Sequence, residues 1–534
     1  MAKYTLTKEQ ISVIECDYKK IRVIAYAGAA KTTTLVGFAR HRPDKRILML
    51  CYNASIAMEN STRFGSNTKV RTSHSFAREK LGEKFQDRVG ELRFIDAKNI
   101  LQTSYWNLVR DSVLTLQNFY NSADRRITIK NFKGRKDPLS QKAKDYNENV
   151  VASAGKLWHS QLDANATTPI DHDFYLKQYY LSPESARTLH DRYDYILIDE
   201  FQDTNAAFLD FIKKTGVPMV VVGDRYQQLY RFRGAVDAMN DDYFDDDESI
   251  TLRLSKSFRF GGKIASVASA IILLQGETVP VEGSNDHNNV GYELPQRVKD
   301  AKVQISYLHR TNAGAIETAL SKAEVGNKIF WCGGIEKYHI QKIKDVALLA
   351  LNKIDDIKDK RLPREFQSFE DYKEYADDTG DHEARRSVKL VEKYKPKKLI
   401  EKLDILFKTA TTDDMEAPIV VSTIHKAKGL EWPYVVLAEM VEFESLLEPK
   451  IDAEEHWKEI EDELNLLYVA VTRAQQGLVI DGNVAMVGNI VQKIKSGKTP
   501  LELPPVWLKR VKPIIDEAEK RIPENERPPA VAIS

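Results

Sequence analysis

Residues 21–34 read Ile21-Arg22-Val23-Ile24-Ala25-Tyr26-Ala27-Gly28-Ala29-Ala30-Lys31-Thr32-Thr33-Thr34. The first four residues predict a buried strand, and the residues from Lys31 onward predict a helix, so a turn joins the two. Such a turn can aim backbone N–H groups at phosphate oxygens, while a lysine offsets the phosphate charge and a threonine hydroxyl ligates Mg²⁺. The order therefore indicates a site for a nucleoside triphosphate, with Gly28, Lys31 and Thr32 as its main residues.

One position departs from the usual pattern of such loops. The residue before the lysine is usually glycine, because backbone must approach phosphate closely there, and in this chain it is Ala30. Taken alone, the stretch is also compatible with a buried strand that runs into a threonine-rich helix. Other parts of the sequence have to decide between the two interpretations.

The composition limits the class of protein. A chain of 534 residues predicts about three or four domains. Its 42% hydrophobic and 29% charged residues are typical of a globular protein, and we find neither a bilayer-spanning apolar stretch nor a signal-like N-terminus. We therefore expect no membrane association and a cytoplasmic location, or a nuclear one if the source is eukaryotic.

Cysteine and charge content exclude some kinds of site. Cys16, Cys51 and Cys332 are scattered without metal-ligand spacing, so we predict no zinc site and no disulfide framework. The net charge of +1 neither supports nor excludes nucleic-acid binding, because a basic groove can be balanced by acidic surface. The acidic run 241–248 is predicted to be a solvated loop.

Short apolar runs recur along the chain and end in polar or acidic residues before a helical pattern. They are Ile47–Leu50, Tyr195–Ile198, Met219–Val222 and Ile419–Val421. This alternation predicts an α/β fold with parallel sheets, in which binding sites lie at the carboxyl ends of the strands. The residues that directly follow each run are therefore the candidates for chemistry.

Two acids follow the run that ends at Ile198. Asp199 can hold Mg²⁺ beside the phosphate loop, and Glu200 can orient or deprotonate the attacking water. The alternative is that both acids cap a helix. The Gln202-Asp203 pair that follows favours the catalytic interpretation over helix capping.

The segment 223–234, after the next strand, combines two kinds of residue. Gln227 carries an amide that can sense a γ-phosphate, and Tyr230, Phe232 and Arg233 can stack on bases. Aromatic residues at such spacing also occur in cores, but the flanking arginines and glycine favour a loop that faces a ligand.

These motifs resemble those of superfamily 1 DNA helicases of the UvrD/Rep type, and most of all the F-box DNA helicase branch. The resemblance runs from about Thr7 to Ala474. Nine segments carry it in the family's order: Thr7–Gln10, the phosphate loop, Leu50–Asn53, Thr72–Phe76, Asp199–Asp203, Gly223–Gly234, Ser257–Phe260, Thr423–Glu431 and Tyr468–Ala474.

The resemblance implies two RecA-like P-loop motor lobes with parallel sheets, each carrying an inserted, mainly helical subdomain. We expect the boundaries to fall as follows: first lobe 1–78 and 186–268, its insertion 79–185, second lobe 269–335 and 416–500, its insertion 336–415, and a C-terminal extension 501–534. Because Gln10 and Lys31 lie near the first residue, we expect no F-box module upstream.

The resemblance also implies a nucleotide site that uses ATP and Mg²⁺. Gln10 would read the adenine edge, Phe258 would stack on its face, and Glu431 would contact the ribose or couple the second lobe to the nucleotide. Arg259 and Arg473 would approach the γ-phosphate from opposite lobes. The implied catalytic residues are Lys31, Glu200, Gln227, Arg259 and Arg473; the implied nucleotide-binding residues are Gln10, Gly28, Ala29, Ala30, Lys31, Thr32, Thr33, Phe258 and Glu431; the implied metal ligands are Thr32 and Asp199.

For DNA, the resemblance implies movement on a single strand, 3′ to 5′, and action at junctions of single and double strands. The residues implied on the track are Asn53, His74, Tyr230, Phe232, Arg233 and His425. For His74 the alternative is a packing or capping role. We expect a monomer, and the sequence names no recruiting protein.

Two functions remain open at this point. The first is a DNA helicase or translocase that couples ATP hydrolysis to unwinding or to protein displacement. The second is a hydrolysis-impaired clamp or scaffold that binds ATP and DNA, because Ala30 replaces the phosphate-loop glycine. The presence of Lys31, Glu200, Arg259 and Arg473 favours the first.

Overall fold

A computed structural model describes residues 5–51, 54–81, 87–134, 140–231, 234–284, 288–296, 298, 303–379, 381–440 and 443–520. Its residues divide into two compact units. Residues 1–25 and 30–254 contribute to the first unit, and residues 26–29 and 255–534 contribute to the second.

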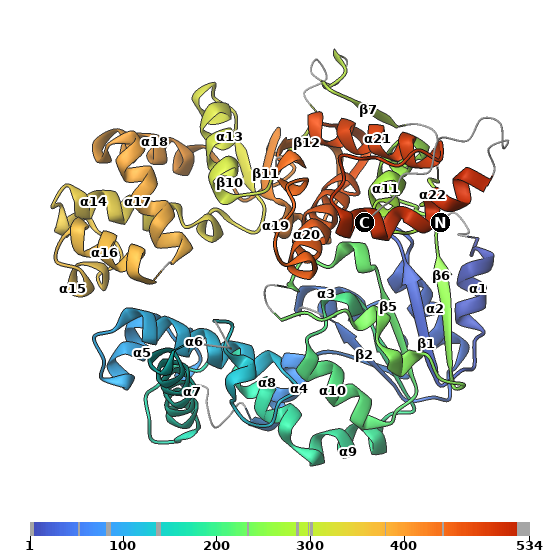
Figure 1. Ribbon diagram of the computed structural model, residues 1–534, viewed down its shortest axis with the longest axis horizontal. Coiled ribbons are helices and arrows are strands. Elements are labelled where there is room, and N and C mark those ends of the chain that lie inside the picture. The colour runs from blue at the N-terminus through green and yellow to red at the C-terminus, as the bar shows by residue number, and fades with distance from the viewer. Residues whose placement is uncertain are drawn as a thin grey trace. The chain divides into compact units, whose positions relative to one another are not determined.

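The first unit is built on a parallel sheet (Figure 1). Its described strands follow the order β3-β2-β4-β5-β1-β6, so β1 is flanked by β5 and β6. Every residue of β2 and β5 is buried, as expected for strands that helices cover on both faces. The strands are β1 (Lys20–Ala25), β2 (Ile47–Cys51), β3 (Thr68–Thr72), β4 (Tyr195–Ile198), β5 (Met219–Gly223) and β6 (Ser249–Leu254).

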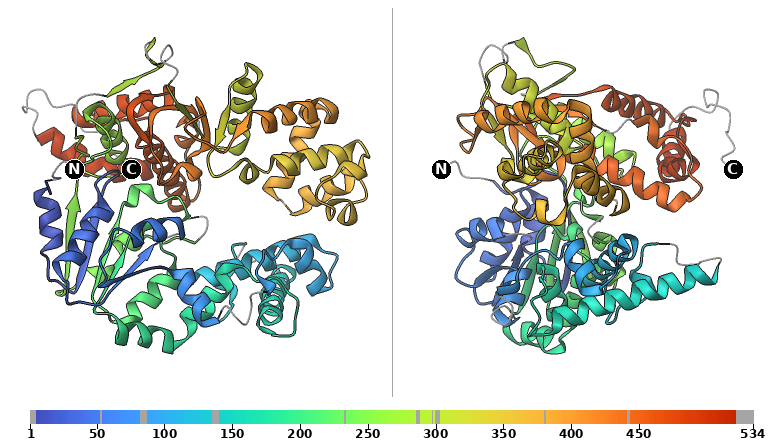
Figure 2. Two further views of the ribbon diagram at one scale, coloured as in Figure 1. Left: turned by 180° about the vertical axis from the view of Figure 1, so that it is seen from behind. Right: turned by 90° about the vertical axis from the view of Figure 1, so that its left-hand side faces the viewer.

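Helices of the first unit share one core with this sheet. Leu48, Ile196 and Val221 of the sheet belong to the same buried cluster as Phe119 and Phe174 of the helices. The long helices α6 and α7 pack against each other (Figure 2). The helices are α1 (Lys8–Ile14), α2 (Lys31–His41), α3 (Ala54–Ser61), α4 (Ser73–Leu81), α5 (Phe94–Leu101), α6 (Trp106–Asn121), α7 (Gln141–Leu162), α8 (His172–Leu181), α9 (Pro183–Arg192) and α10 (Ala206–Thr215).

A second parallel sheet organises the second unit. The order of its described strands is β10-β9-β11-β8-β12-β13-β7, and each adjacent pair is parallel. The strands are β7 (Asn289–Gly291), β8 (Ile305–His309), β9 (Ile329–Trp331), β10 (Ala410–Thr411), β11 (Ile419–Thr423), β12 (Trp432–Glu439) and β13 (Ala474–Val479).

The helices of the second unit form a core with one half of this sheet. Trp331 and Val421 belong to the same buried cluster as Ile343, Tyr372 and Leu403 of the helices between β9 and β11. Helix α20 contacts α11 and α22 (Figure 1). The helices are α11 (Gly262–Leu273), α13 (Asn312–Glu324), α14 (Ile340–Ala350), α15 (Leu362–Glu365), α16 (Phe369–Thr379), α17 (His382–Tyr394), α18 (Pro396–Thr409), α19 (Ile424–Ala427), α20 (Ala453–Val471), α21 (Gly482–Lys495) and α22 (Pro505–Lys520).

The predicted α/β class with two parallel sheets is thus confirmed, as are the four apolar strands after residue 40. The acidic run 241–248 is largely exposed, as predicted for a solvated loop, but it also makes contacts that the sequence did not indicate. Phe244 is buried, and Asp245 and Asp246 form ion pairs with Arg22 and Lys20 of the neighbouring strand. The run is held because β1 presents basic side chains next to it.

In the described part of the chain, no helix has the length and apolar character needed to cross a bilayer.

Candidate active site

The turn between β1 and α2 ends in a left-handed residue. Ala30 has φ 56° and ψ 41° and precedes Lys31, the first residue of α2. An L-residue in this conformation has its Cβ close to the following carbonyl oxygen, which costs roughly 1–2 kcal/mol. The glycine that such loops usually carry would adopt it freely. Ala30 is therefore a strained position, and the strain lies where the sequence departs from the pattern.

Lys31 lies among acids that come from the ends of β4 and β5. Its Nζ is 3.0 Å from Oε1 of Glu200, and its side chain is 12% exposed. Burial by itself lowers the pKa of Lys31, but the carboxylates of Glu200, Asp199 and Asp224 outweigh it and raise that pKa above its ordinary value. The lysine is therefore held as a cation beside the turn.

Thr32 and Asp199 converge on each other. The Thr32 hydroxyl donates a hydrogen bond of 3.0 Å to Oδ2 of Asp199, whose other oxygen accepts the backbone N–H of Glu200. Burial, followed by the charge of Glu200, raises the pKa of Asp199. A hydroxyl and a carboxylate that lie this close together suit Mg²⁺. This ion takes few protein ligands and completes its shell with water and substrate phosphates. These two residues therefore fit the predicted metal position.

Glu200 is the second left-handed residue of the site. Its φ is 53°, and its Oε2 accepts a hydrogen bond of 2.5 Å from Nε2 of Gln202. Backbone strain at a non-glycine residue is retained where the surrounding structure enforces it, and such positions cluster at functional sites. The left-handed turn places the Glu200 carboxylate beside Lys31.

A chain of hydrogen bonds connects Glu200 to Gln227. Gln202 donates to Glu200 and accepts from the backbone N–H of Asp224 at 3.0 Å. Oδ2 of Asp224 in turn accepts a 2.7 Å hydrogen bond from Nε2 of Gln227. The water-activating candidate and the predicted γ-phosphate sensor are therefore joined through two residues to which the sequence analysis gave no role.

Gln10 and Thr33 make contacts inside the first unit. Gln10 completes a capping box with Thr7, and its Nε2 donates to the Thr34 hydroxyl at 3.2 Å. The Thr33 hydroxyl accepts a 2.9 Å hydrogen bond from Arg63. Gln10 is fully buried, so its amide serves the start of α1 in this structure.

Within the second unit, the segment 26–29 packs on the residues that follow β6. Gly28 has φ +74°, and a Cβ added to it would lie 2.7 Å from Cβ of Arg259. The Gly28 carbonyl accepts the Phe258 N–H at 2.9 Å, and the Ala29 N–H bonds to the Tyr26 carbonyl. A side chain at position 28 would have to push this segment away, so Gly28 is fixed by space as well as by its φ.

Arg259 is held by an acid of its own unit. Its Nε donates to Oε2 of Glu431 at 2.5 Å, and its Nη1 donates to the Thr472 carbonyl at 3.0 Å. The other oxygen of Glu431 accepts a 2.8 Å hydrogen bond from Gln475. Glu431 therefore binds an arginine that we predict to contact phosphate.

Arg473 follows helix α20 and is almost completely buried. Its Nε donates to the Val469 carbonyl and its Nη1 to the Leu430 carbonyl. Arg259 and Arg473 both belong to the second unit, whereas the sequence analysis assigned them to opposite lobes. Within that unit Arg259 bonds to Glu431 and to the Thr472 carbonyl.

The structure describes part of the predicted DNA track. His74 lies on α4, with Nε2 3.9 Å from Oδ1 of Asp173 and a side chain 42% exposed. Tyr230 and His425 are half-buried, after β5 and on α19 respectively. Asn53, Phe232 and Arg233 lie outside the described residues.

Several site residues were not assigned from the sequence. Gln202 and Asp224 stood in motifs that we had recognised, but only their hydrogen bonds indicate that they connect Glu200 with Gln227. Gln475 directly follows a recognised motif, but nothing in the neighbouring sequence indicates a role at the site. Its contact with Glu431 depends on the pairing of β12 with β13.

Two family models match the chain. Residues 6–244 match the UvrD/REP helicase N-terminal domain, and residues 353–483 match the UvrD-like helicase C-terminal domain. Both matches agree with the order of motifs along the chain.

Three DNA helicases from other organisms are similar to this chain over most of its length. F-box DNA helicase 1 of Gallus gallus is 28% identical, over 90% of this chain and 49% of that protein. F-box DNA helicase protein 1 of Schizosaccharomyces pombe is 27% identical, over 90% of this chain and 58% of that protein. ATP-dependent DNA helicase PcrA of Staphylococcus epidermidis is 23% identical, over 95% of this chain and 86% of that protein. The chain thus spans about half the length of the two F-box relatives.

Proposed function

Because this chain belongs to the UvrD/REP helicase family, we propose that it is an ATP-dependent DNA helicase that moves along single-stranded DNA from 3′ to 5′. The observation that carries the proposal is the cluster of Lys31, Thr32, Asp199 and Glu200 at the carboxyl edge of the first sheet. It contains the cation, the metal ligands and the base that phosphoryl transfer to water requires.

Lys31 and Glu200 form an ion pair within the first unit. When ATP binds, its β- and γ-phosphates compete with Glu200 for the Lys31 ammonium. The Glu200 carboxylate is then free to orient the attacking water and to accept its proton. Thr32 and Asp199 would hold Mg²⁺, which neutralises charge on the phosphate oxygens. The chain from Glu200 to Gln227 would report the γ-phosphate to the residues after β5.

Arg259 makes a similar exchange in the second unit. Its partner Glu431 is an exposed carboxylate, and a triphosphate carries more negative charge, so Arg259 can leave Glu431 for the γ-phosphate. Arg473 would supply a second guanidinium. Two arginines that reach the phosphate only in the ATP state tie hydrolysis to a change of conformation.

DNA would be bound by stacking and by phosphate contacts. Candidate residues are His74, Tyr230 and His425, together with Asn53, Phe232 and Arg233. Such binding reads few base edges, so we expect weak sequence preference and a strong dependence on salt.

The direction of movement gives a test on the intact chain. We expect ATP-dependent separation of a duplex that carries a 3′ single-stranded tail, and little separation of the same duplex with a 5′ tail or blunt ends. Strand displacement is read by fluorescence, with Glu200→Gln as the inactive control. Equal unwinding from both tails, or preference for the 5′ tail, contradicts the proposed direction.

The second candidate function, a clamp that binds ATP and DNA without hydrolysis, has one observation in its favour, the strain at Ala30. Ala30→Gly should raise the free energy of unfolding by about 0.5–1 kcal/mol, because relief of the left-handed strain exceeds the entropy that glycine adds to the unfolded chain. Ala29→Gly is the matched control. Ala29 is buried and does not have a positive φ, so the Ala29→Gly variant should be less stable than the unchanged chain. Thermal melts compare the two.

The same variants separate the two functions. If the chain is a helicase, it hydrolyses ATP with Ala30 in place, and Ala30→Gly alters turnover by less than about tenfold. Hydrolysis that appears only after Ala30→Gly would establish the clamp instead.

A further inference from the structure

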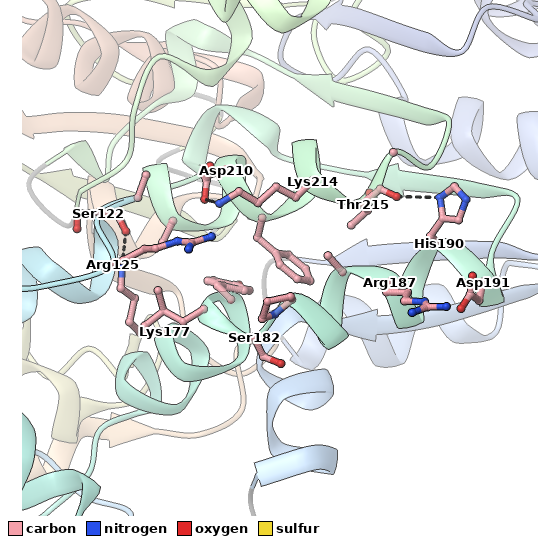
Figure 3. A pocket seen from close by; sticks show the side chains of 18 residues that line it. Ser122, Arg125, Lys177, Ser182, Arg187, His190, Asp191, Asp210, Lys214 and Thr215 are labelled. Atoms are coloured by element: carbon pink, nitrogen blue, oxygen red, sulfur yellow. Dashed lines mark hydrogen bonds and ion pairs between the residues drawn. The ribbon is translucent and has the colours of Figure 1, made fainter.

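The first unit contains a cavity that no part of the nucleotide site lines (Figure 3). Its volume is about 540 Å³, and it lies where α8, α9 and α10 meet the segment after α6 that contains Ser122 and Arg125. Cavities of this size accommodate small organic ligands.

The wall of the cavity is partly apolar. Tyr180, Leu181, Ala186, Ala207 and Phe211 contribute to it. The rings of Tyr180 and Phe211 stack, with centroids 4.9 Å apart and an angle of 29° between their planes. Such a wall suits the flat face of a heterocycle better than a fully hydrated group.

Cationic side chains gather at one end of the cavity. Figure 3 shows Arg125, Lys177 and Lys214 there, with Arg187 and His190 at the other end. Lys214 forms an ion pair with Asp210. Within the described residues, Arg125 makes no hydrogen bond or ion pair, so its guanidinium is available to an anion.

Lys177 adds a buried charge to this end. Its side chain is 1% exposed, and its Nζ donates to the carbonyls of Ser122 at 2.5 Å and Asp124 at 2.7 Å. The pKa of Lys177 is lowered to about 8, chiefly by burial and in part by the charge of Lys214, while Asp124 and Asp210 act in the opposite direction. An anion bound here would stabilise the charged lysine.

We propose that this cavity binds a nucleoside 5′-monophosphate group, with the phosphate at Arg125, Lys177 and Lys214 and the base against the apolar wall. Guanidinium and ammonium groups suit a phosphate, and an uncharged ligand would leave the Arg125 guanidinium without an anionic partner, whereas Lys214 already pairs with Asp210. The group can come from a free mononucleotide or from the 5′ end of a DNA strand. This site is separate from the ATP site and does not depend on the proposed helicase activity.

The test measures nucleotide binding to the full chain in a Lys31→Ala background, which weakens the ATP site. Fluorescent AMP is titrated and followed by anisotropy. We expect saturable binding that Arg125→Ala weakens by about tenfold and Arg125→Ala with Lys214→Ala by more, as for lost charge-assisted hydrogen bonds. Arg126→Ala is the matched control, because Arg126 is an exposed neighbour that does not line the cavity, and it should alter binding less than about twofold.

A second variant tests the cavity without changing charge. Ala186→Leu would fill it from α9, and it should weaken AMP binding while a thermal melt shows that the chain folds. Competition by a 5′-phosphorylated oligonucleotide, but not by the same strand with a 5′-hydroxyl, identifies a strand end as the source. Competition by AMP alone identifies the free nucleotide.

Three results would overturn the site. They are absence of AMP binding up to about 1 mM, equal weakening by Arg125→Ala and Arg126→Ala, and displacement of AMP binding by an acidic peptide more readily than by unlabelled AMP. ATP hydrolysis by the Arg125→Ala chain, with Lys31 intact, should stay unchanged, so that loss of this site and loss of the proposed motor activity are distinguishable.

Discussion

Replacing Glu200 by glutamine should lower the rate of ATP hydrolysis by about 10²- to 10⁴-fold, the range for a lost general base. The amide keeps the size of the side chain but cannot accept a proton from water. ATP binding should persist, because Lys31 and Thr32 are unchanged and Lys31 loses a competing carboxylate. Single-turnover hydrolysis and binding of a fluorescent ATP analogue measure the two effects separately.

A matched control for this substitution is Glu248→Gln. Glu248 lies in the same unit, also pairs with a lysine, Lys19, and is exposed. We expect it to change the hydrolysis rate less than about twofold. If Glu200→Gln hydrolyses ATP at a rate similar to that of Glu248→Gln, then Glu200 is not the base and the left-handed turn at Glu200 has another purpose.

Arg259→Ala should lower the hydrolysis rate by about 10³-fold or more, as expected for an arginine that stabilises the transferring phosphoryl group. The loss should appear mainly in kcat, because the contact is made most strongly in the transition state. Steady-state kinetics over a range of ATP concentrations measure it. Arg385→Ala is the control, since that arginine on α17 donates to the backbone carbonyls of Ala376 and Asp377 on α16 and has no predicted role at the nucleotide site.

Glu431→Gln distinguishes this role of Arg259 from a structural one. The substitution weakens the pair with Arg259 but keeps a hydrogen-bond acceptor, so kcat should fall less than about tenfold. If Glu431→Gln and Arg259→Ala cause the same loss, the ion pair itself is what activity requires, and transfer of Arg259 to phosphate is wrong.

The strands of both sheets could be predicted because their signals are local. Apolar runs of four residues at Tyr195 and Met219 end in Asp199 and in Gly223-Asp224, and parallel pairing brings these ends to one edge. That edge explains why Thr32 and Asp199, far apart in sequence, form a hydrogen bond.

The connections between site residues could not be predicted in the same way. Gln202 bonds to both Glu200 and Asp224 because the neighbouring parallel strands β4 and β5 end at the same edge of the sheet. Gln475 reaches Glu431 through the register of β12 and β13. Contacts of this kind depend on tertiary structure, and residue type alone does not reveal them.

The acidic run 241–248 shows the limit of reading charge from one segment. Eight residues with six acids predict a solvated loop, and most of them are exposed, but the sequence did not indicate that Phe244 is buried or that Asp246 pairs with Lys20 of β1. At Ala30 the sequence already indicated an unusual residue. The structure shows why it is unusual: the backbone is left-handed there, and the residue carries a side chain.

Coupling of ATP hydrolysis to single-stranded DNA is tested most directly by the steady-state rate of ATP hydrolysis with Mg²⁺, measured with and without an unstructured single strand. We predict a low rate without DNA, at least about tenfold stimulation by the strand, and loss of that stimulation at high salt. A rate that DNA leaves unchanged, in a chain shown by anisotropy to bind the same strand, would contradict coupling of hydrolysis to DNA.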